Sequence, residues 1–251
     1  MIEIQGLVKR FGTLTAVHRL DLRVTPGEIF GFLGPNGAGK TTTVKLITGL
    51  LKPTEGSVRV AGFDVAAQTL AAKRVMGLVP DEPFVYPKLT GSEYLRFIGE
   101  LYGVPLDVQK KRVPELLEMF ELGVWGGELL ESYSHGMRQK LVIAGILLHE
   151  PKVLILDEPM VGLDPKSARM VKDILKQLRL RGTAIFMCTH VLEIAEKLCD
   201  RIGIMIGGKL VALGTLDELR AKAESGGHQG LEDIFLSLTG GHEYASLLKN
   251  L

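Results

Sequence analysis

The sequence predicts an α/β fold with a mainly parallel sheet flanked by helices. Two observations support this prediction. Short, continuously apolar runs recur with helix-like segments between them, at residues 29–33, 75–79, 153–156, 184–188 and 202–206. Such runs are typical of strands that are covered on both faces, as in a parallel sheet. In addition, a glycine-rich segment follows the first run directly and opens a helix, as phosphate-binding loops do.

The first 24 residues have a different pattern. Residues 2–4 and 20–24 alternate apolar and polar side chains, which is typical of strands with one face in water. We therefore expect a small antiparallel β-subdomain at the start of the chain.

Strand-like runs disappear between Thr90 and Glu131, where apolar side chains recur at helical spacing. They are Tyr94, Leu95, Ile98, Leu101 and Tyr102, followed by Val113, Leu116, Leu117 and Phe120. We predict a helical subdomain at about residues 90–149, inserted into one domain of residues 1–220.

The end of the chain is expected to form a short helical extension at residues 221–251. The glycine-containing segment 225–230 predicts a flexible joint, and residues 231–238 predict a short amphipathic helix.

Composition excludes several classes of protein. The 30 Lys and Arg against 29 Asp and Glu give a net charge of +1, so no global field attracts nucleic acid, and we expect no nucleic-acid partner. The spacing of the two cysteines, Cys188 and Cys199, suggests core packing rather than a metal site or a disulfide. No apolar run approaches the ~18 residues that span a bilayer. With no secretory signal at Met1, we expect a cytoplasmic protein that reaches a membrane only as a peripheral subunit.

Residues 34–41 match the phosphate-loop pattern G-x-x-x-x-G-K-[ST] at every fixed position. The expected nucleotide-binding residues are Gly34, Pro35, Asn36, Gly37, Ala38, Gly39, Lys40, Thr41 and Thr42. Glycines allow backbone N–H groups to approach phosphate oxygens, Lys40 reaches the β- and γ-phosphates, and Thr41 offers its hydroxyl to Mg²⁺. An ordinary glycine-rich turn is the alternative. A GTPase is disfavoured because the only asparagines, Asn36 and Asn250, leave no Asn-Lys-x-Asp motif.

Two carboxylates, Asp157 and Glu158, follow the apolar run 153–156. They lie at the carboxyl end of a predicted parallel strand, where open α/β sheets bind ligands. Asp157 can face Mg²⁺ while Glu158 addresses a water molecule. A solvated turn or a helix cap would explain the same pair. Asp164 and Pro165 form a good helix start, and His190 ends the next strand-like run.

Residues 133–139 read Tyr-Ser-His-Gly-Met-Arg-Gln and precede the two carboxylates. This segment resembles the signature motif of ABC ATPases. Residues 162–164 resemble the D-loop of that family, His190 its switch histidine, and Phe11 the aromatic residue that stacks on adenine. The resemblance extends over about residues 2–213 and implies the ABC-ATPase form of the P-loop NTPase fold.

The resemblance implies a role for each of these residues, with ATP and Mg²⁺ as cofactors. Glu158 would be the general base, His190 would contact the γ-phosphate, and Phe11 would stack on the base. Ser134 and Gly136 would bind ATP held by a second copy, which implies an ATP-dependent head-to-tail dimer. A strand-core role remains an alternative for Phe11, and a simple helix cap an alternative for Ser134.

The sequence departs from the common family pattern at several positions. His135 and Met137 replace Gly and Gln in the signature, Met160 stands where many relatives have Thr or Ser, and Asp81 replaces the usual glutamine of the Q-loop. An acid at position 81 can bind Mg²⁺ or its water. Together with the tail at residues 231–240, these departures resemble ATPase subunits of ABC-2-type exporters.

The implied function is therefore an ATP-hydrolysing subunit that powers a separate integral membrane permease from the inner face of the membrane. Two other classes are considered. A soluble ABC ATPase acting on ribosomes or DNA usually carries two cassettes or a long coiled-coil insert, and this sequence has neither. A P-loop kinase would leave the signature-like segment unexplained.

Overall fold

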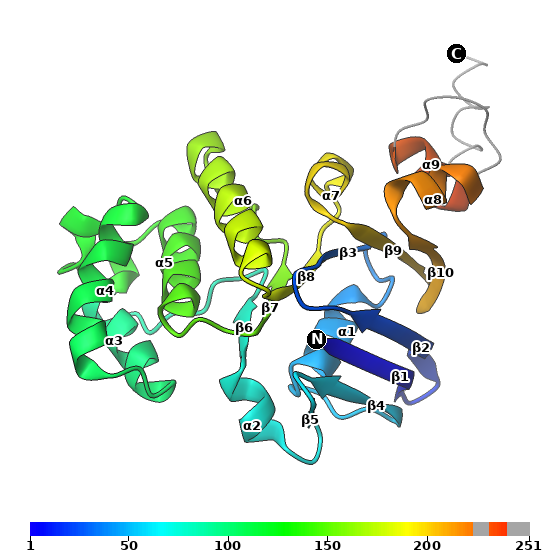
Figure 1. Ribbon diagram of the computed structural model, residues 1–251, viewed down its shortest axis with the longest axis horizontal. Coiled ribbons are helices and arrows are strands. Elements are labelled where there is room, and N and C mark those ends of the chain that lie inside the picture. Colours follow the sequence, from blue (N-terminus) through cyan, green and yellow to red (C-terminus); the bar gives the residue numbers. More distant parts are fainter. Residues whose placement is uncertain (223–230, 240–251) are drawn as a thin grey trace.

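The computed structural model describes residues 1–222 and 231–239, and their arrangement is shown in Figure 1. Its antiparallel sheet has the order β2-β1-β4-β5, with β1 (Ile2–Phe11), β2 (Leu14–Val24), β4 (Glu55–Val60) and β5 (Phe63–Asp64). The predicted N-terminal subdomain is therefore confirmed. Residues 55–64, which follow the phosphate loop in sequence, complete it by pairing on the free edge of β1.

The second sheet has six strands in the order β10-β9-β3-β8-β7-β6. The strands are β3 (Ile29–Leu33), β6 (Met76–Val79), β7 (Val153–Asp157), β8 (Ala184–Cys188), β9 (Arg201–Ile206) and β10 (Lys209–Gly214). All pairs are parallel except β9 with β10. The five predicted apolar runs are all strands of this sheet, so the α/β prediction is confirmed.

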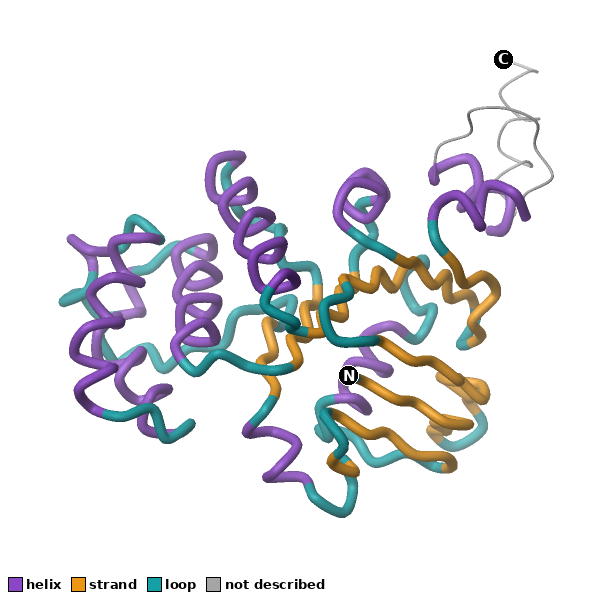
Figure 2. Tube along the Cα trace, viewed as in Figure 1, coloured by secondary structure: helices purple, strands orange, loops and turns teal. Residues whose placement is uncertain are grey.

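Helices lie on both sides of the six-stranded sheet, as the purple segments in Figure 2 show. In Figure 1, α1 lies between the two sheets, whereas α6 and α7 lie on the other side. The core helices are α1 (Lys40–Ile47), α2 (Thr69–Arg74), α6 (Pro165–Leu180), α7 (Leu192–Leu198), α8 (Leu216–Lys222) and α9 (Leu231–Thr239). The predicted C-terminal helix corresponds to α9, and the predicted joint at 225–230 lies outside the described residues.

The residues between β6 and β7 form a group of helices at one end of the molecule, coloured green in Figure 1. They are α3 (Gly91–Leu101), α4 (Leu106–Met119) and α5 (His135–Leu148), with two 3-10 turns at Gly123–Trp125 and Leu130–Ser132. Helix α5 contacts both α3 and α4, and its residues 141–148 are all buried. Such a helix, apolar nearly all round, has neighbours on every face.

Polar side chains cap the N-termini of α3, α5 and α6. Thr90 and Glu93 form a reciprocal capping box on α3, Ser134 caps α5, and Asp164 caps α6 with Pro165 in the first turn. The caps satisfy N–H groups that have no partner within the helix. The helix start predicted at Asp164 and Pro165 is therefore confirmed.

The register of the parallel strands brings distant segments of the chain together. Val79 pairs with Leu156, and Asp157 pairs with Cys188, so the carboxyl ends of β6, β7 and β8 lie side by side. β3 pairs with β8 and ends where the phosphate loop begins. Below this edge, Phe30, Phe32 and Phe186 are fully buried, with ring centroids 5.2–6.4 Å apart. This core fixes the strands whose ends carry the site.

A stacked pair of rings joins the ends of α3 and α5. The rings of Tyr102 and His149 are nearly parallel, with centroids 3.7 Å apart. Both ring nitrogens of His149 are buried and have no hydrogen-bond partner among the described residues. Burial lowers the pKa of His149 from 6.5 to about 4. The histidine is therefore neutral in the folded protein near neutral pH.

Replacing His149 with phenylalanine should remove a pH dependence of stability. Between the unfolded pKa and about 4, the unfolded chain binds a proton at His149 that the folded chain does not bind. Stability is therefore full above the unfolded pKa and is lost as the pH falls. From about pH 7.5 to about pH 5, urea unfolding should show a loss about 1–2 kcal/mol larger in the wild type than in His149→Phe. Equal losses in the two proteins would contradict a neutral, desolvated imidazole.

Candidate active site

The phosphate loop borders a pocket of about 630 Å³ between the start of α1 and the edge of the antiparallel sheet. Loop residues Asn36, Gly37, Gly39, Lys40, Thr41 and Thr42 line one side of it. Phe11, at the end of β1, lines the other side and is 46% exposed. Phe11 is therefore not a core residue, and the Lys9 ammonium lies over its ring, 5.0 Å from the ring centroid. The sequence did not indicate that Gly207 and Gly208 also line this pocket.

Two glycines of the loop are required by close backbone contacts. Gly39 has φ of 106°, and a Cβ there would lie 2.4 Å from the carbonyl oxygen of Ala16. A Cβ on Gly34 would lie 2.3 Å from the carbonyl oxygen of Met205. The loop therefore packs on β2 and β9 in a way that only glycine permits.

The Lys40 ammonium lies within the curve of the loop. Its Nζ donates hydrogen bonds to the carbonyl oxygens of Gly34 (2.6 Å) and Pro35 (3.0 Å), and the residue is 9% exposed. The loop thus holds a buried positive charge at its centre. Anionic phosphate oxygens are the ligands that suit such a cradle of N–H groups and one ammonium.

Asp157 is the buried carboxylate of this site, with 5% exposure. Burial raises its pKa, and the charges of Asp81 and Glu158 raise it further. A hydrogen bond from the Thr41 side chain and the charge of Lys40 act in the opposite direction. Asp157 therefore lies near Thr41 and Asp81, the two residues predicted to bind the metal with it, and near Lys40 and Glu158, the predicted base.

This donor set fits Mg²⁺. A raised carboxyl pKa marks negative charge that is not fully balanced, and a divalent cation would balance it. Mg²⁺ usually takes one or two carboxylates and completes its shell with water and phosphate oxygens. Among the described residues, no cluster of three or more His, Cys, Asp and Glu side chains could hold a metal ion.

Glu158 is held by two partners at the end of β8. Its Oε1 lies 2.7 Å from Nδ1 of His190, and its Oε2 accepts a hydrogen bond from the Thr189 hydroxyl at 3.1 Å. The backbone of Glu158 has φ of 51°, an uncommon conformation for a side-chain-bearing residue and one that often occurs at functional sites. The sequence analysis gave Glu158 and His190 separate roles, and the structure places their side chains in contact.

Thr189 was missed by sequence reasoning. It is 2% exposed, and its hydroxyl also accepts a hydrogen bond from the N–H of Val191 at 3.1 Å. The available signal was a hydroxyl residue between a buried strand and a histidine at the ligand-binding edge of the sheet. That signal is weak because threonine is common at strand ends.

The signature-like segment, residues 133–139, does not line the pocket at the phosphate loop. Ser134 is exposed and caps α5, accepting a hydrogen bond from the N–H of Met137 at 3.3 Å. Gly136 packs so closely on the D-loop that a Cβ would lie 2.7 Å from the carbonyl oxygen of Gly162. Neither Ser134 nor Gly136 lines the pocket around Lys40. Within one chain, the structure does not bring them to the phosphate loop.

Comparison with known proteins gives consistent matches. The family model for the ABC transporter matches residues 17–161. The linearmycin resistance ATP-binding protein LnrL of Bacillus subtilis is 39% identical over 219 residues, covering 87% of this chain and 70% of the relative. The daunorubicin/doxorubicin resistance ATP-binding protein DrrA of Streptomyces peucetius is 40% identical over 224 residues, covering 89% and 68%.

Solved structures agree with the sequence comparisons. The structure of an ATP-binding subunit of an ABC transporter superposes with a TM-score of 0.91 at 32% identity, covering 95% of this chain and 99% of that chain. A dimeric, post-hydrolysis state of the ATP-binding cassette MJ0796, bound to ADP and Pi, gives a TM-score of 0.79 at 26% identity, covering 86% and 99%.

The fold and the phosphate loop define a P-loop ATPase. The chain belongs to the ABC transporter family, and it is an ATP-binding, ATP-hydrolysing subunit of a transporter. The comparisons do not support a soluble ABC ATPase of ribosomes or DNA. Within residues 1–222 and 231–239, no helix combines the length and the apolar character needed to cross a membrane.

Replacing Gly37 or Gly39 with alanine should lower the free energy of unfolding by different amounts, because only a Cβ at position 39 would collide with neighbouring atoms. Gly37 and Gly39 both have positive φ, but a Cβ on Gly37 meets nothing within 4 Å. Gly37→Ala should cost about 1–2 kcal/mol, the penalty of left-handed backbone. Gly39→Ala should cost roughly 1–3 kcal/mol more because it also forces the loop away from Ala16. Urea unfolding without nucleotide measures both, and equal losses would show that the loop does not need this close approach.

Proposed function

We propose that two copies of this chain bind two ATP molecules head to tail and use their hydrolysis to drive an integral membrane permease. The observation that carries the proposal is the convergence of Lys40, Asp157 and Glu158 in one chain while Ser134 and Gly136 face away from that pocket. A second copy can supply the missing half. The N-terminus of α5, with its partial positive charge and exposed Ser134, suits the γ-phosphate of ATP on the other copy.

Within each site, we propose the following roles. Phe11 stacks on adenine, and residues 34–42 hold the phosphates through backbone N–H groups and Lys40. Thr41, Asp157 and Asp81 would hold Mg²⁺, which balances the negative charge that develops during phosphoryl transfer. Glu158 is the general base that orients the attacking water.

Within one chain, His190 and Thr189 contact the two carboxylate oxygens of Glu158. We infer that Thr189 is a positioning residue, because its buried hydroxyl fixes one oxygen of the base relative to the loop that carries His190. His190 is then free to turn toward the γ-phosphate while Thr189 still orients Glu158.

Substituting Glu158 tests these roles. Glu158→Gln should keep ATP binding, lower turnover about 10²–10⁴-fold because the base is lost, and accumulate a dimer.

Substituting Thr189 tests the positioning role. Thr189→Val should lower turnover less than Glu158→Gln does and leave the KM for ATP unchanged. Thr189→Ser, which keeps the hydroxyl, should restore turnover. Phosphate release and light scattering with MgATP measure both properties.

Three results would contradict the proposal. They are brisk hydrolysis by the Glu158→Gln variant, a monomer at saturating MgATP, and no change in turnover for Thr189→Val.

An aromatic surface beside the site provides a place for the permease. Phe84, Tyr86 and Phe97 are 75%, 47% and 39% exposed, and their rings meet edge to face at 5.8 and 5.4 Å. Exposed aromatic clusters are typical of protein interfaces. Phe84 and Tyr86 lie three and five residues after Asp81 in the sequence, and Phe97 lies on α3. We propose that the permease docks here and holds the subunit at the cytoplasmic face of the membrane.

The relatives indicate a direction of transport. Their names describe resistance to linearmycin and to daunorubicin or doxorubicin, and export of Nod factor in Ralstonia nicotianae. We therefore propose export for this chain.

Removing the exposed aromatic ring should uncouple membrane attachment from ATP hydrolysis. Phe84→Ser should leave the ATPase activity of the isolated subunit unchanged and abolish its co-sedimentation with host membranes, because the docking contact is lost. Leu180→Ser is the matched control, since Leu180 is 76% exposed at the end of α6. If Phe84→Ser remained on the membranes as fully as Leu180→Ser, the aromatic surface would not be the docking site.

A further inference from the structure

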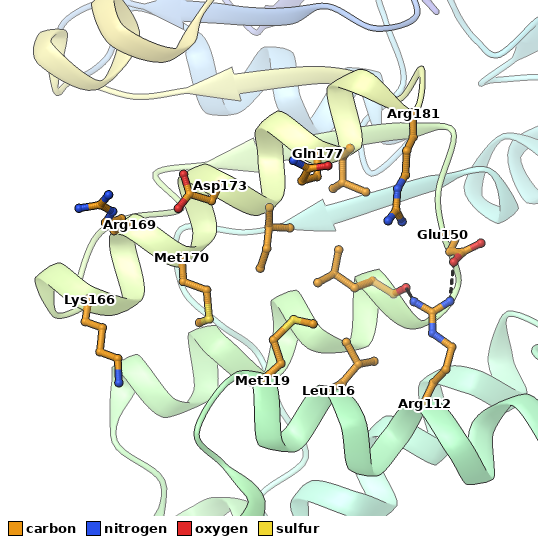
Figure 3. A pocket seen from close by; sticks show the side chains of 13 residues that line it. Arg112, Leu116, Met119, Glu150, Lys166, Arg169, Met170, Asp173, Gln177 and Arg181 are labelled. Carbon is orange, nitrogen blue, oxygen red and sulfur yellow. Dashed lines mark hydrogen bonds and ion pairs between the residues drawn. The ribbon is translucent and has the colours of Figure 1, made fainter.

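A groove of about 530 Å³ runs between α6 and the helices α4 and α5 (Figure 3). We call it the α4–α6 groove. Its apolar lining consists of Leu116, Met119, Leu147, Met170, Ile174 and Leu178. It shares no lining residue with the pocket at the phosphate loop. Its volume lies within the roughly 300–1,000 Å³ of small-molecule sites.

The floor of the groove is the outer layer of the main core. Leu116, Leu147 and Leu178 are 4–9% exposed and belong to the largest apolar cluster. The walls are adjustable, because Met119 is 50% exposed and Met170 is partly buried. Methionine side chains fit ligands of irregular shape. The groove therefore offers apolar contact to an unbranched chain.

The rim of the groove carries more positive than negative charge. Its cations are Arg112, Lys166, Arg169 and Arg181, and its acids are Glu150 and Asp173.

Only two of the four cations are paired. Arg112 bonds to Glu150 at 2.5 Å, and Lys166 pairs with Glu121, which lies outside the lining. Within the described part of the chain, Arg169 and Arg181 form no ion pair.

Two arginines, Arg112 and Arg181, line one end of the groove. Figure 3 shows Arg181, from the end of α6, pointing toward Arg112 on α4, with Glu150 beside Arg112. Glu150 pairs with Arg112, whereas Arg181 has no ion-pair partner among the described residues, so an anion beside Arg181 would complete the charge balance. Guanidinium groups bind carboxylate and sulfate oxygens with two parallel hydrogen bonds. The apolar side chains Leu116, Met119 and Met170 lie along the groove from that end.

We propose that the α4–α6 groove binds a single-chain amphiphile with one anionic head group. The head lies between Arg181 and Arg112, and the chain lies on Leu116, Met119 and Met170. Because α4 and α5 belong to the helical group and α6 follows the D-loop, the ligand bridges the two parts of the subunit. The site is distinct from the nucleotide pocket and from the aromatic surface.

Calorimetric titration of the full chain with dodecanoate, below its micelle concentration, tests the proposal. Saturable binding is expected, and Arg181→Glu should weaken it about ten-fold or more, because a charge-assisted bond is replaced by repulsion. Lys176→Glu carries the same charge change on an exposed part of α6 outside the groove and should bind like the wild type. Binding should weaken about three- to four-fold for each methylene removed from the chain.

Dodecyltrimethylammonium, with the same chain and the opposite charge, should not compete. The proposal is overturned if dodecanoate does not saturate the protein, if Arg181→Glu and Lys176→Glu bind equally, or if the cationic amphiphile binds as well. Binding that does not depend on chain length would also overturn it.

Discussion

The charge balance around Asp157 is the constraint on which the site depends. A buried carboxylate next to two other acids is costly, and its raised pKa reflects that cost. Lys40 and the Thr41 hydroxyl offset part of it from the phosphate loop. The parallel pairing of β3, β8, β7 and β6 brings these opposing charges together. The electrostatics of the site therefore depend on the pairing of the strands. Bound Mg²⁺ would offset the negative charge of the carboxylates, and the phosphates of ATP would offset the positive charge of Lys40.

A second feature is that one chain contains only part of the proposed ATP site. The base, Glu158, is held by Thr189 and His190 within the chain, whereas Ser134 and Gly136 lie against the D-loop and away from the phosphate loop. Gly136 and Gly162 make this contact close, because neither carries a side chain. The D-loop and the signature segment are therefore in direct backbone contact within one chain.

The two surfaces proposed to bind other molecules lie at or beside the helical group. Phe84, Tyr86 and Phe97 extend from the end of β6 to α3, and the α4–α6 groove lies between this group and α6. Both surfaces combine exposed apolar atoms with nearby charge. They differ in shape and charge: the aromatic rings are an exposed cluster, whereas the groove is hollow and has two arginines at one end.

The sequence by itself determined the α/β class, the phosphate loop and the acids at the strand end, because continuous apolar runs and glycine spacing are local patterns. It also indicated the signature segment and the caps of α5 and α6. Only the tertiary structure decided that Phe11 is exposed at the pocket rather than buried, that residues 55–64 join the first sheet, and that Thr189 holds Glu158. These facts depend on contacts between residues far apart in the chain, where strand register and packing, and not periodicity, determine which side chains meet.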